Sequence, residues 1–349
     1  MSGFPRRSET FALNELVALE AAGLLEAVFA TKAGDGSTHP GLERVAHRVR
    51  TLAPGSPAEQ AREVAVALAD VAISGLHAYF AHVPAEVASH AAGFLGCPWG
   101  FSTHALDARK VPPAELAERA RQAACIVACN HDVAAELSAL GARVTLIPHG
   151  VDIRRFQADG PATINGRLMV LAVGRLVEKK GFSVLIDAVA LADEPLSVRI
   201  VGDGPLHEHL VAQIASAGVA DRVTLSGPMT HADLPGAYQA AQVVVVPSIV
   251  NAEGDRDGLP NVVLEAMAMG RPVVGSDVGA VSAAVEHGAT GILVPPGDAV
   301  ALAAAFDRLS TDVALRERLG VAARHRVEHD YELGTCTARL IDHLETAYA

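Results

Sequence analysis

Several features are scarce in this 349-residue sequence, and each scarcity excludes a class of protein. The four cysteines are too few and too scattered for a disulfide framework in a chain of this length. No stretch reaches the roughly 18 to 20 continuous apolar residues of a membrane span. The formal net charge of -12 argues against a nucleic-acid binder, because such proteins hold phosphates with basic side chains. We therefore expect a cytoplasmic protein with no nucleic-acid partner, and we leave open a peripheral contact with the inner face of the membrane.

The residues that are abundant indicate a globular α/β protein. Half of them are hydrophobic, aromatics make up only 4%, and 31 glycines and 19 prolines recur between the apolar runs. The length allows two domains that each bury a core.

From residue 167 onward, short apolar runs alternate with stretches of helical length, which is typical of a parallel sheet covered by helices. We predict strands at 168–173, 197–201, 222–225, 242–246, 272–275 and 291–294. We predict helices between and after them at 182–192, 206–217, 231–241, 260–269, 280–286 and 299–309. This pattern predicts a doubly wound domain.

The first half is less regular, with a helix expected at 9–22 and strands at 27–30, 45–52 and 99–102. The polar segment 152–165 is the expected linker. We therefore predict an N-terminal Rossmann-like domain at 1–151, a C-terminal one at 152–330, and a last helix at 331–349 that crosses back to the first domain.

The segment from Gly174 to Gly181 joins a predicted strand to a predicted helix and carries cations. A glycine turn at a helix start is typical of an anion site, and Arg175 with Lys180 suits a diphosphate. The alternative is that both are solvated loop cations.

The segment from Val201 to Pro205 resembles the start of a dinucleotide fingerprint. His207 stands where the third glycine belongs, which makes a nicotinamide enzyme a weak alternative. Gly204 is interpreted as part of a tight turn, either beside a nucleotide base or purely structural.

The segment from Asn251 to Ala268 is the richest in candidate residues. Asp257 precedes the helix expected at Pro260, and Glu265 lies about a turn and a half inside it, so both carboxylates can face one ligand with sugar hydroxyls. The alternatives are helix-dipole carboxylates on a solvated face, or a metal motif formed with Asp255, which we disfavour.

The first half offers fewer candidates. His104 follows a predicted strand, at the carboxyl edge of its domain, although a lone histidine is more often a structural hydrogen-bonding group. The polar turn near Ser8, Glu9 and Thr10 either lines a cleft or starts a helix, with Ser8 or Thr10 as its cap.

Taken in order, the segments from Ile147 to Pro296 resemble family 4 of the retaining glycosyltransferases, especially its exopolysaccharide, colanic-acid-like branch. These are Pro-His-Gly-Val-Asp, Gly-Arg-Leu with Lys-Lys-Gly, Val-Gly-Asp-Gly-Pro and Gly-Leu-Pro-Asn-Val-Val-Leu-Glu-Ala-Met-Ala. The resemblance implies a GT-B fold, in which two Rossmann-like domains face across a cleft. It also implies transfer of a sugar from a UDP- or GDP-sugar to a glycan, lipid-linked or small-molecule acceptor, with retention and without a metal or cofactor.

The resemblance also implies roles for individual residues. Arg175 and Lys180 hold the diphosphate, Glu265 takes the ribose hydroxyls, and Gly204 lies near the base. The transferred sugar is held by Asp257 and the backbone at Gly258, Leu259, Pro260 and Asn261, with His104 near the reacting centre. The acceptor side is assigned to Ser8, Glu9, Thr10 and Asp107.

Two departures from the family stand out. Asp257 occupies a position where the family usually has Glu, which shortens its reach by one methylene. The family's first hydrophobic strand is missing ahead of Phe4, through either a true deletion or a misassigned start. The alternatives to a transferase are therefore a GT-B-like epimerase or hydrolase, and a donor-binding but inactive partner subunit.

Overall fold

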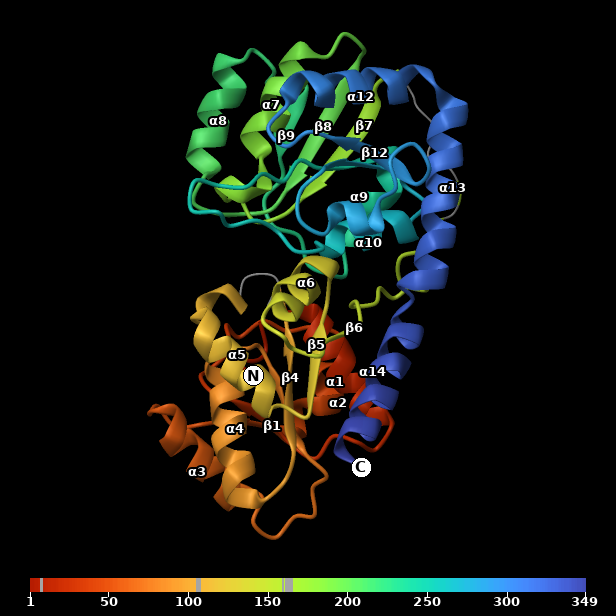
Figure 1. Ribbon diagram of the computed structural model, residues 1–349. Coiled ribbons are helices and arrows are strands. Elements are labelled where there is room, and N and C mark those ends of the chain that lie inside the picture. The colour runs from red at the N-terminus through yellow and green to blue at the C-terminus, as the bar shows by residue number, and fades with distance from the viewer. Residues whose placement is uncertain (7–8, 105–107, 159, 161–165) are drawn as a thin grey trace. The chain divides into compact units, whose positions relative to one another are not determined.

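A computed structural model describes residues 1–6, 9–104, 108–158, 160 and 166–349 (Figure 1). The chain divides into two compact units. The first comprises Met1–Gly150 together with Leu333–Ala349, and the second comprises Val151–Glu332. Within the described residues, no helix is long and apolar enough to cross a membrane.

The second unit is built on one six-stranded sheet. Its strands are β7 (Leu168–Val173), β8 (Leu196–Val201), β9 (Val223–Leu225), β10 (Val243–Val246), β11 (Val273–Ser276) and β12 (Gly291–Val294). They pair in the order β12-β11-β10-β7-β8-β9, and every pairing is parallel. This is the order of a Rossmann-type doubly wound sheet, as predicted.

Helices cover both faces of this sheet (Figure 1). They are η3 (Glu178–Lys180), α7 (Phe182–Leu191), α8 (His207–Ser216), α9 (Leu234–Ala240), α10 (Asn261–Ala268), α11 (Val281–Ala284), α12 (Ala299–Thr311) and α13 (Val313–Asp330). Successive strand residues point to opposite faces, so Val243 and Val245 join the core under α7, α8 and α12, while Val244 and Val246 join the core under α9, α10 and α11. Burial on both faces explains why these strands are continuously apolar.

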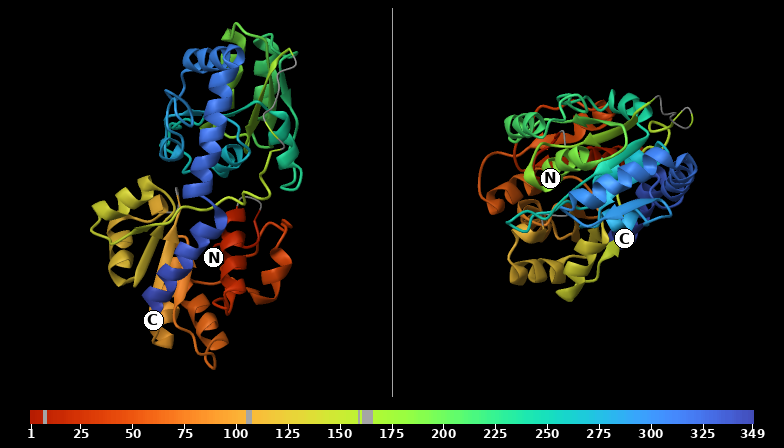
Figure 2. Two further views of the ribbon diagram at one scale, coloured as in Figure 1. Left: turned by 90° about the vertical axis from the view of Figure 1, so that its right-hand side faces the viewer. Right: turned by 90° about the horizontal axis from the view of Figure 1, so that it is seen from above.

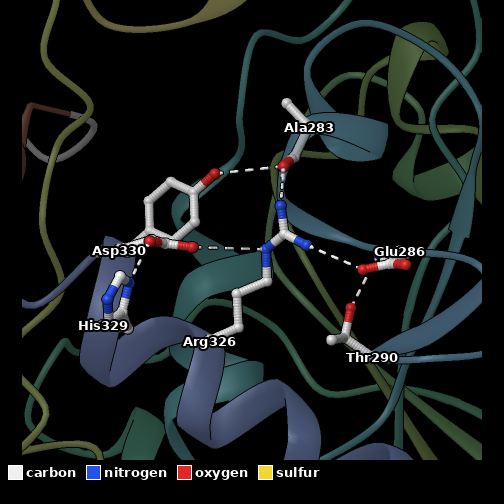
Figure 3. A network of polar contacts seen from close by, with 7 residues as sticks. Ala283, Glu286, Thr290, Arg326, His329 and Asp330 are labelled. Carbon is white, nitrogen blue, oxygen red and sulfur yellow. Dashed lines mark hydrogen bonds and ion pairs between the residues drawn. The ribbon is translucent and has the colours of Figure 1, made fainter.

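Helix α13 packs along α10 (Figure 2). Its Arg326 donates through Nη2 to the Ala283 carbonyl at 2.8 Å and lies 3.4 Å from Glu286 Oε2 (Figure 3). Tyr331 Oη donates to the same carbonyl at 3.3 Å. These bonds fasten the end of α13 to α11 and the turn that follows it.

The first unit contains two separate parallel sheets. One pairs β1 (Val28–Ala30) with β2 (Val49–Thr51). The other runs β3 (Leu76–Tyr79), β4 (Trp99–Thr103), β5 (Cys125–Ala128) and β6 (Thr145–Leu146). The predicted strand at 45–52 is wrong in its first part. Gly41, at φ +92°, starts a helical turn there, and only Val49–Thr51 is a strand.

The helices of the first unit come from both ends of the chain. They are α1 (Thr10–Ala21), α2 (Leu42–Val45), η1 (Ala46–Arg48), α3 (Pro57–Ala67), α4 (Val83–Leu95), η2 (Ala108–Lys110), α5 (Pro113–Gln122), α6 (His131–Ala139) and α14 (Leu333–Tyr348). Helix α14 belongs to this unit because Leu340 and Leu344 pack with Leu19 of α1 and Val127 of β5.

Candidate functional site

The strand order of the second unit reverses between β7 and β10, which are neighbours in the sheet but not in the sequence. Ligands of open α/β sheets bind at such a point, outside the carboxyl ends of the strands. Two loops leave β7 and β10 there, 174–181 and 247–260. The predicted anion loop and the predicted sugar-binding segment therefore lie on adjacent strands.

Gly181 lets these two loops touch. Its φ is +65°, and a Cβ at this position would stand 1.8 Å from the Pro247 carbonyl oxygen, so only glycine fits. A backbone hydrogen bond from Ile249 N to Lys179 O, at 2.9 Å, joins the loops beside it. The contact brings the lysine doublet against the second loop.

Four charged side chains meet between the loops, and we call them the lysine–aspartate cluster: Lys179, Lys180, Asp255 and Asp257. Lys180 Nζ lies 2.8 Å from Asp257 Oδ2, and Lys179 Nζ lies 3.0 Å from Asp255 Oδ2. The buried Ser248 donates through Oγ to Asp257 Oδ2 at 2.8 Å. The four charges sum to zero, and Asp257 is held by two donors.

Sequence reasoning found part of this cluster. It assigned Lys180 and Asp257 to the site, considered Asp255 only as a metal ligand, and missed Lys179 and Ser248. The Lys179-Lys180 pair in the sequence is a signal that could have identified both cations. No local spacing in the sequence links Ser248 to Asp257. Arg175 of the same loop is exposed, so its predicted role toward a diphosphate stays a prediction.

Helix α10 starts immediately after the second loop, with Pro260 at its N-cap. The predicted sugar-binding residues Gly258, Leu259, Pro260 and Asn261 therefore lie between Asp257 and the first turn. Backbone N–H groups in the first turn of a helix lack partners within that helix and attract anionic or hydroxyl oxygens. This arrangement is compatible with the predicted contact, which stays a prediction.

Glu265 is buried in α10 and belongs to a different network from Asp257. Tyr238 Oη donates to Glu265 Oε2 at 2.6 Å, and His231 Nε2 lies 3.7 Å from Oε1. Burial, followed by the charge of Glu265, raises the pKa of Tyr238 well above its usual value, so this phenol stays a donor. The carboxylate is thus held rigidly in place, and its predicted role toward a ribose stays a prediction.

Gly204 packs tightly against the first loop. A Cβ at Gly204 would lie 2.6 Å from the Leu176 carbonyl oxygen, and Leu176 N donates to Asp203 O at 2.8 Å. The close approach alone requires glycine here. The predicted position of Gly204 beside a nucleotide base is compatible with this turn.

A second group of candidate residues lies in the first unit, where His104 follows β4 at the carboxyl edge of the sheet, as predicted. Its ring stacks on that of His149, with centroids 4.9 Å apart and planes at 13°. Phe11 of α1 stacks on His149 at 4.1 Å, and Glu15 Oε1, one turn further along α1, lies 2.6 Å from His149 Nδ1. We call Phe11, Glu15, His104 and His149 the histidine cluster.

The two imidazoles of this cluster have opposite electrostatic environments. Burial, then the neighbouring His149 and His77, lowers the pKa of His104 well below its usual value. Burial also acts to lower the pKa of His149, but the charge of Glu15 and hydrogen bonds outweigh it and raise that pKa to about 10. At neutral pH the cluster therefore combines a neutral His104 with a cationic His149 that is paired with Glu15.

Two of the predicted acceptor-side residues, Glu9 and Thr10, lie at the start of α1. Glu9 is the N-cap of α1, is buried, and lies 3.4 Å from Arg6. Thr10 is the buried first helical residue, so the expectation that it caps the helix is wrong. Ser8 and Asp107 lie outside the described residues.

Across the described parts of the chain, no group of three or more histidine, cysteine, aspartate or glutamate side chains is arranged to hold a metal ion. The expectation of a reaction without a metal stays a prediction.

Comparison with known proteins identifies similar sequences. The model of the family "Glycosyl transferases group 1" matches residues 167–312. The amylovoran biosynthesis glycosyltransferase AmsK of Erwinia amylovora is 32% identical over 206 residues, covering 58% of this chain and 51% of that protein. The putative colanic acid biosynthesis glycosyltransferase WcaL of Escherichia coli is 37% identical over 193 residues, covering 52% and 46%. The chain thus spans about half the length of these curated relatives.

Solved structures match over nearly the whole chain. Anabaena HepE in complex with UDP has a TM-score of 0.81 at 21% identity, covering 95% of this chain and 96% of that one. Sucrose-phosphate synthase from Thermosynechococcus elongatus has a TM-score of 0.80 at 23% identity, covering 97% and 93%. At these identities the likeness shows the fold, and it confirms the predicted GT-B class. Residues 167–312 are a domain of the glycosyl transferases group 1 family, and the resemblance of the chain to family 4 glycosyltransferases of the exopolysaccharide branch is confirmed.

Proposed function

We propose that this chain transfers a sugar from a nucleoside diphosphate donor, of the UDP or GDP type, to a hydroxyl of a glycan, lipid-linked or small-molecule acceptor. The observation that carries the proposal is the lysine–aspartate cluster, at the strand-order reversal and directly ahead of α10. It offers cations for a diphosphate and a carboxylate for sugar hydroxyls within one pair of loops. The UDP bound by the similar fold of HepE agrees with a donor of this class.

In this proposal Lys180, with Arg175, neutralises the diphosphate as it leaves the sugar, and no metal takes part. The C1–O bond to the diphosphate breaks, and the acceptor oxygen bonds to C1 on the same face. Because the new bond forms on the face that the diphosphate leaves, the anomeric configuration is retained. The acceptor proton passes to the departing phosphate oxygen. Asp257 and the N–H groups at the start of α10 orient the sugar, and Glu265 accepts from the ribose.

The neutral His104 suits a hydrogen bond to a sugar hydroxyl better than a charge contact, because its low pKa keeps the imidazole unprotonated. We assign it to the transferred sugar. His149 then serves to hold the His104 ring in place, since the two rings are stacked.

The first experiment is thermal stabilisation of the purified chain by UDP, GDP, ADP, their common sugars and NAD, each with and without magnesium. A ligand at about a hundred times its Kd adds roughly 2.7 kcal/mol to the free energy of unfolding. A shift with one nucleoside diphosphate that is independent of magnesium supports the donor site. A shift with NAD alone contradicts it.

Product analysis then separates transfer from its rivals. Incubating the donor with and without candidate acceptors, followed by NMR of the anomeric centre, distinguishes a retained glycoside from free sugar or an epimer. Binding without turnover, persisting in Asp257→Glu, indicates a donor-binding partner subunit instead. The structure gives a reason to test this alternative, because the Asp257 carboxylate already contacts Lys180 and Ser248.

A further inference from the structure

The two oxygens of the buried Glu265 carboxylate have different neighbours. Oε2 accepts a hydrogen bond from Tyr238 Oη at 2.6 Å, and Oε1 lies 3.7 Å from His231 Nε2. A separation of 3.7 Å is too long for a hydrogen bond, so Oε1 and Nε2 lie side by side without bonding to each other. A ligand hydroxyl can therefore bond to either atom without breaking a bond between them.

The backbone holds His231 in this position. The residue lies in the turn that precedes α9, where Thr230 Oγ1 donates to Asp233 Oδ2 at 2.5 Å and Asp233 N donates to Thr230 O at 3.1 Å. The Arg155 guanidinium donates to the His231 carbonyl oxygen. The His231 side chain is 21% exposed, so the turn is fixed while the imidazole stays within reach of a ligand.

The loop that carries His231 begins beside the turn assigned to the nucleotide. This loop, 226–233, joins β9 to α9, and Gly202 N donates to Gly227 O at 2.9 Å. Gly202 lies two positions before Gly204, which is predicted to lie near the base. The loop thus leads from the predicted position of the base to Glu265, the predicted acceptor for the ribose. A ribose bound there lies next to both Glu265 and His231.

We propose that Glu265 and His231 each recognise one of the two ribose hydroxyls of the donor, so that this chain selects ribonucleoside diphosphates over their deoxyribose counterparts. One hydroxyl donates to Glu265 Oε1. The other bonds to His231 Nε2, which donates or accepts according to its tautomer. Because Tyr238 occupies Oε2, a second residue serves the second hydroxyl. This inference rests on the proposed donor site and adds the class of nucleoside that the site takes.

The loss of one hydroxyl has a cost that can be measured. A site that is built to bond a hydroxyl rejects the analogue without it, because the protein atom that faced the hydroxyl is left desolvated and unpaired. We expect the absence of either hydroxyl to weaken binding by at least about fivefold. Donors built on thymidine diphosphate lack the 2′-hydroxyl and should be poor ligands for the same reason.

The test measures the Kd of UDP, 2′-deoxy-UDP and 3′-deoxy-UDP by isothermal titration, or of the matching guanosine diphosphates if GDP is the nucleotide that stabilises the chain. The unaltered chain should bind UDP at least about fivefold more tightly than either analogue. His231→Ala should no longer distinguish UDP from one of the analogues and should keep its preference over the other. His325→Ala is the matched control. Its side chain is 76% exposed on α13, so no Kd should change by more than about twofold.

Glu265→Gln separates direct recognition by His231 from a supporting role. This variant should lose most of the discrimination for the hydroxyl to which His231→Ala still responds. If both variants lose their response to the same hydroxyl, His231 only positions the carboxylate. If Glu265→Gln loses its response to both hydroxyls and His231→Ala to neither, the carboxylate takes the whole diol. Either result overturns the proposal.

Failure of the donor site itself gives a different pattern. A folded chain that binds none of UDP, GDP and ADP contradicts the proposed function and this inference together. A chain that binds one of them and its deoxy analogues equally well keeps the proposed donor site and overturns only the inference. If His231→Ala does not fold, His231→Phe keeps an aromatic ring against Phe156 and removes both nitrogens, and the same pattern of Kd values is expected.

Discussion

Lys180→Met tests the proposed donor site most directly, because methionine keeps the apolar stem and removes the charge. The Lys180 side chain is 18% exposed and that of Asp257 is 9% exposed, so the pair is only partly screened by water. A hydrogen bond to a charged group contributes about 1.5 to 3 kcal/mol. Losing such a bond to a diphosphate weakens binding by about 10- to 150-fold.

The change in net charge of the cluster lowers the affinity of Lys180→Met for the nucleotide further. Lys179, Lys180, Asp255 and Asp257 sum to zero, and removing one lysine leaves a net charge of -1 facing an anionic ligand. The double variant Lys180→Met/Asp257→Asn restores neutrality. It should therefore bind the nucleotide about tenfold more tightly than Lys180→Met does, because one partly screened repulsion has been removed.

The assay is isothermal titration with whichever of UDP, GDP or ADP stabilises the unaltered chain, with circular dichroism to verify folding. Arg167→Met is the matched control, since Arg167 makes an exposed ion pair with Asp221 and should leave affinity within about twofold. If folded Lys180→Met binds the nucleotide as tightly as the unaltered chain, the assignment of the diphosphate to this loop is wrong.

Three further outcomes are expected. Glu265→Gln should weaken nucleotide binding, measured by titration, by about tenfold or more, because the ribose loses a charged acceptor. Tyr238→Phe should chiefly lower the free energy of unfolding, by about 1 to 3 kcal/mol. If Tyr238→Phe weakens binding and Glu265→Gln only lowers stability, this assignment is contradicted. Asp257→Glu should change kcat/KM at least about tenfold while the Kd of the nucleoside diphosphate stays within about twofold, since this carboxylate is assigned to the sugar; an equal change in both refutes that assignment. The raised pKa of His149 stabilises the fold fully below about pH 6.5, and this contribution is lost as pH rises toward about 10. In urea unfolding, the free energy of unfolding of His149→Gln should therefore fall less at alkaline pH than that of the unaltered chain. Parallel curves contradict the pairing with Glu15.

Local patterns were enough to predict most of the second unit. Strands 168–173 and 291–294 agree with β7 and β12, because a strand buried on both faces needs a short continuous apolar run. Glycine and proline mark the ends of α10, with Pro260 at the N-cap and Gly270 at φ +62° after it. The first unit was less predictable, because Ala46–Arg48 follows a helical turn started by Gly41 that its apolar pattern does not reveal.

By itself, the sequence determined which elements form and which loops follow which strands, since hydrophobic period and turn residues act over a few neighbouring positions. Only the tertiary structure decided which side chains meet. Lys179 and Asp255 are 76 positions apart, and Glu15 and His149 are 134 apart. Their contacts depend on strand order in the sheets and on the packing of helices against them, and no local spacing in the chain encodes either one.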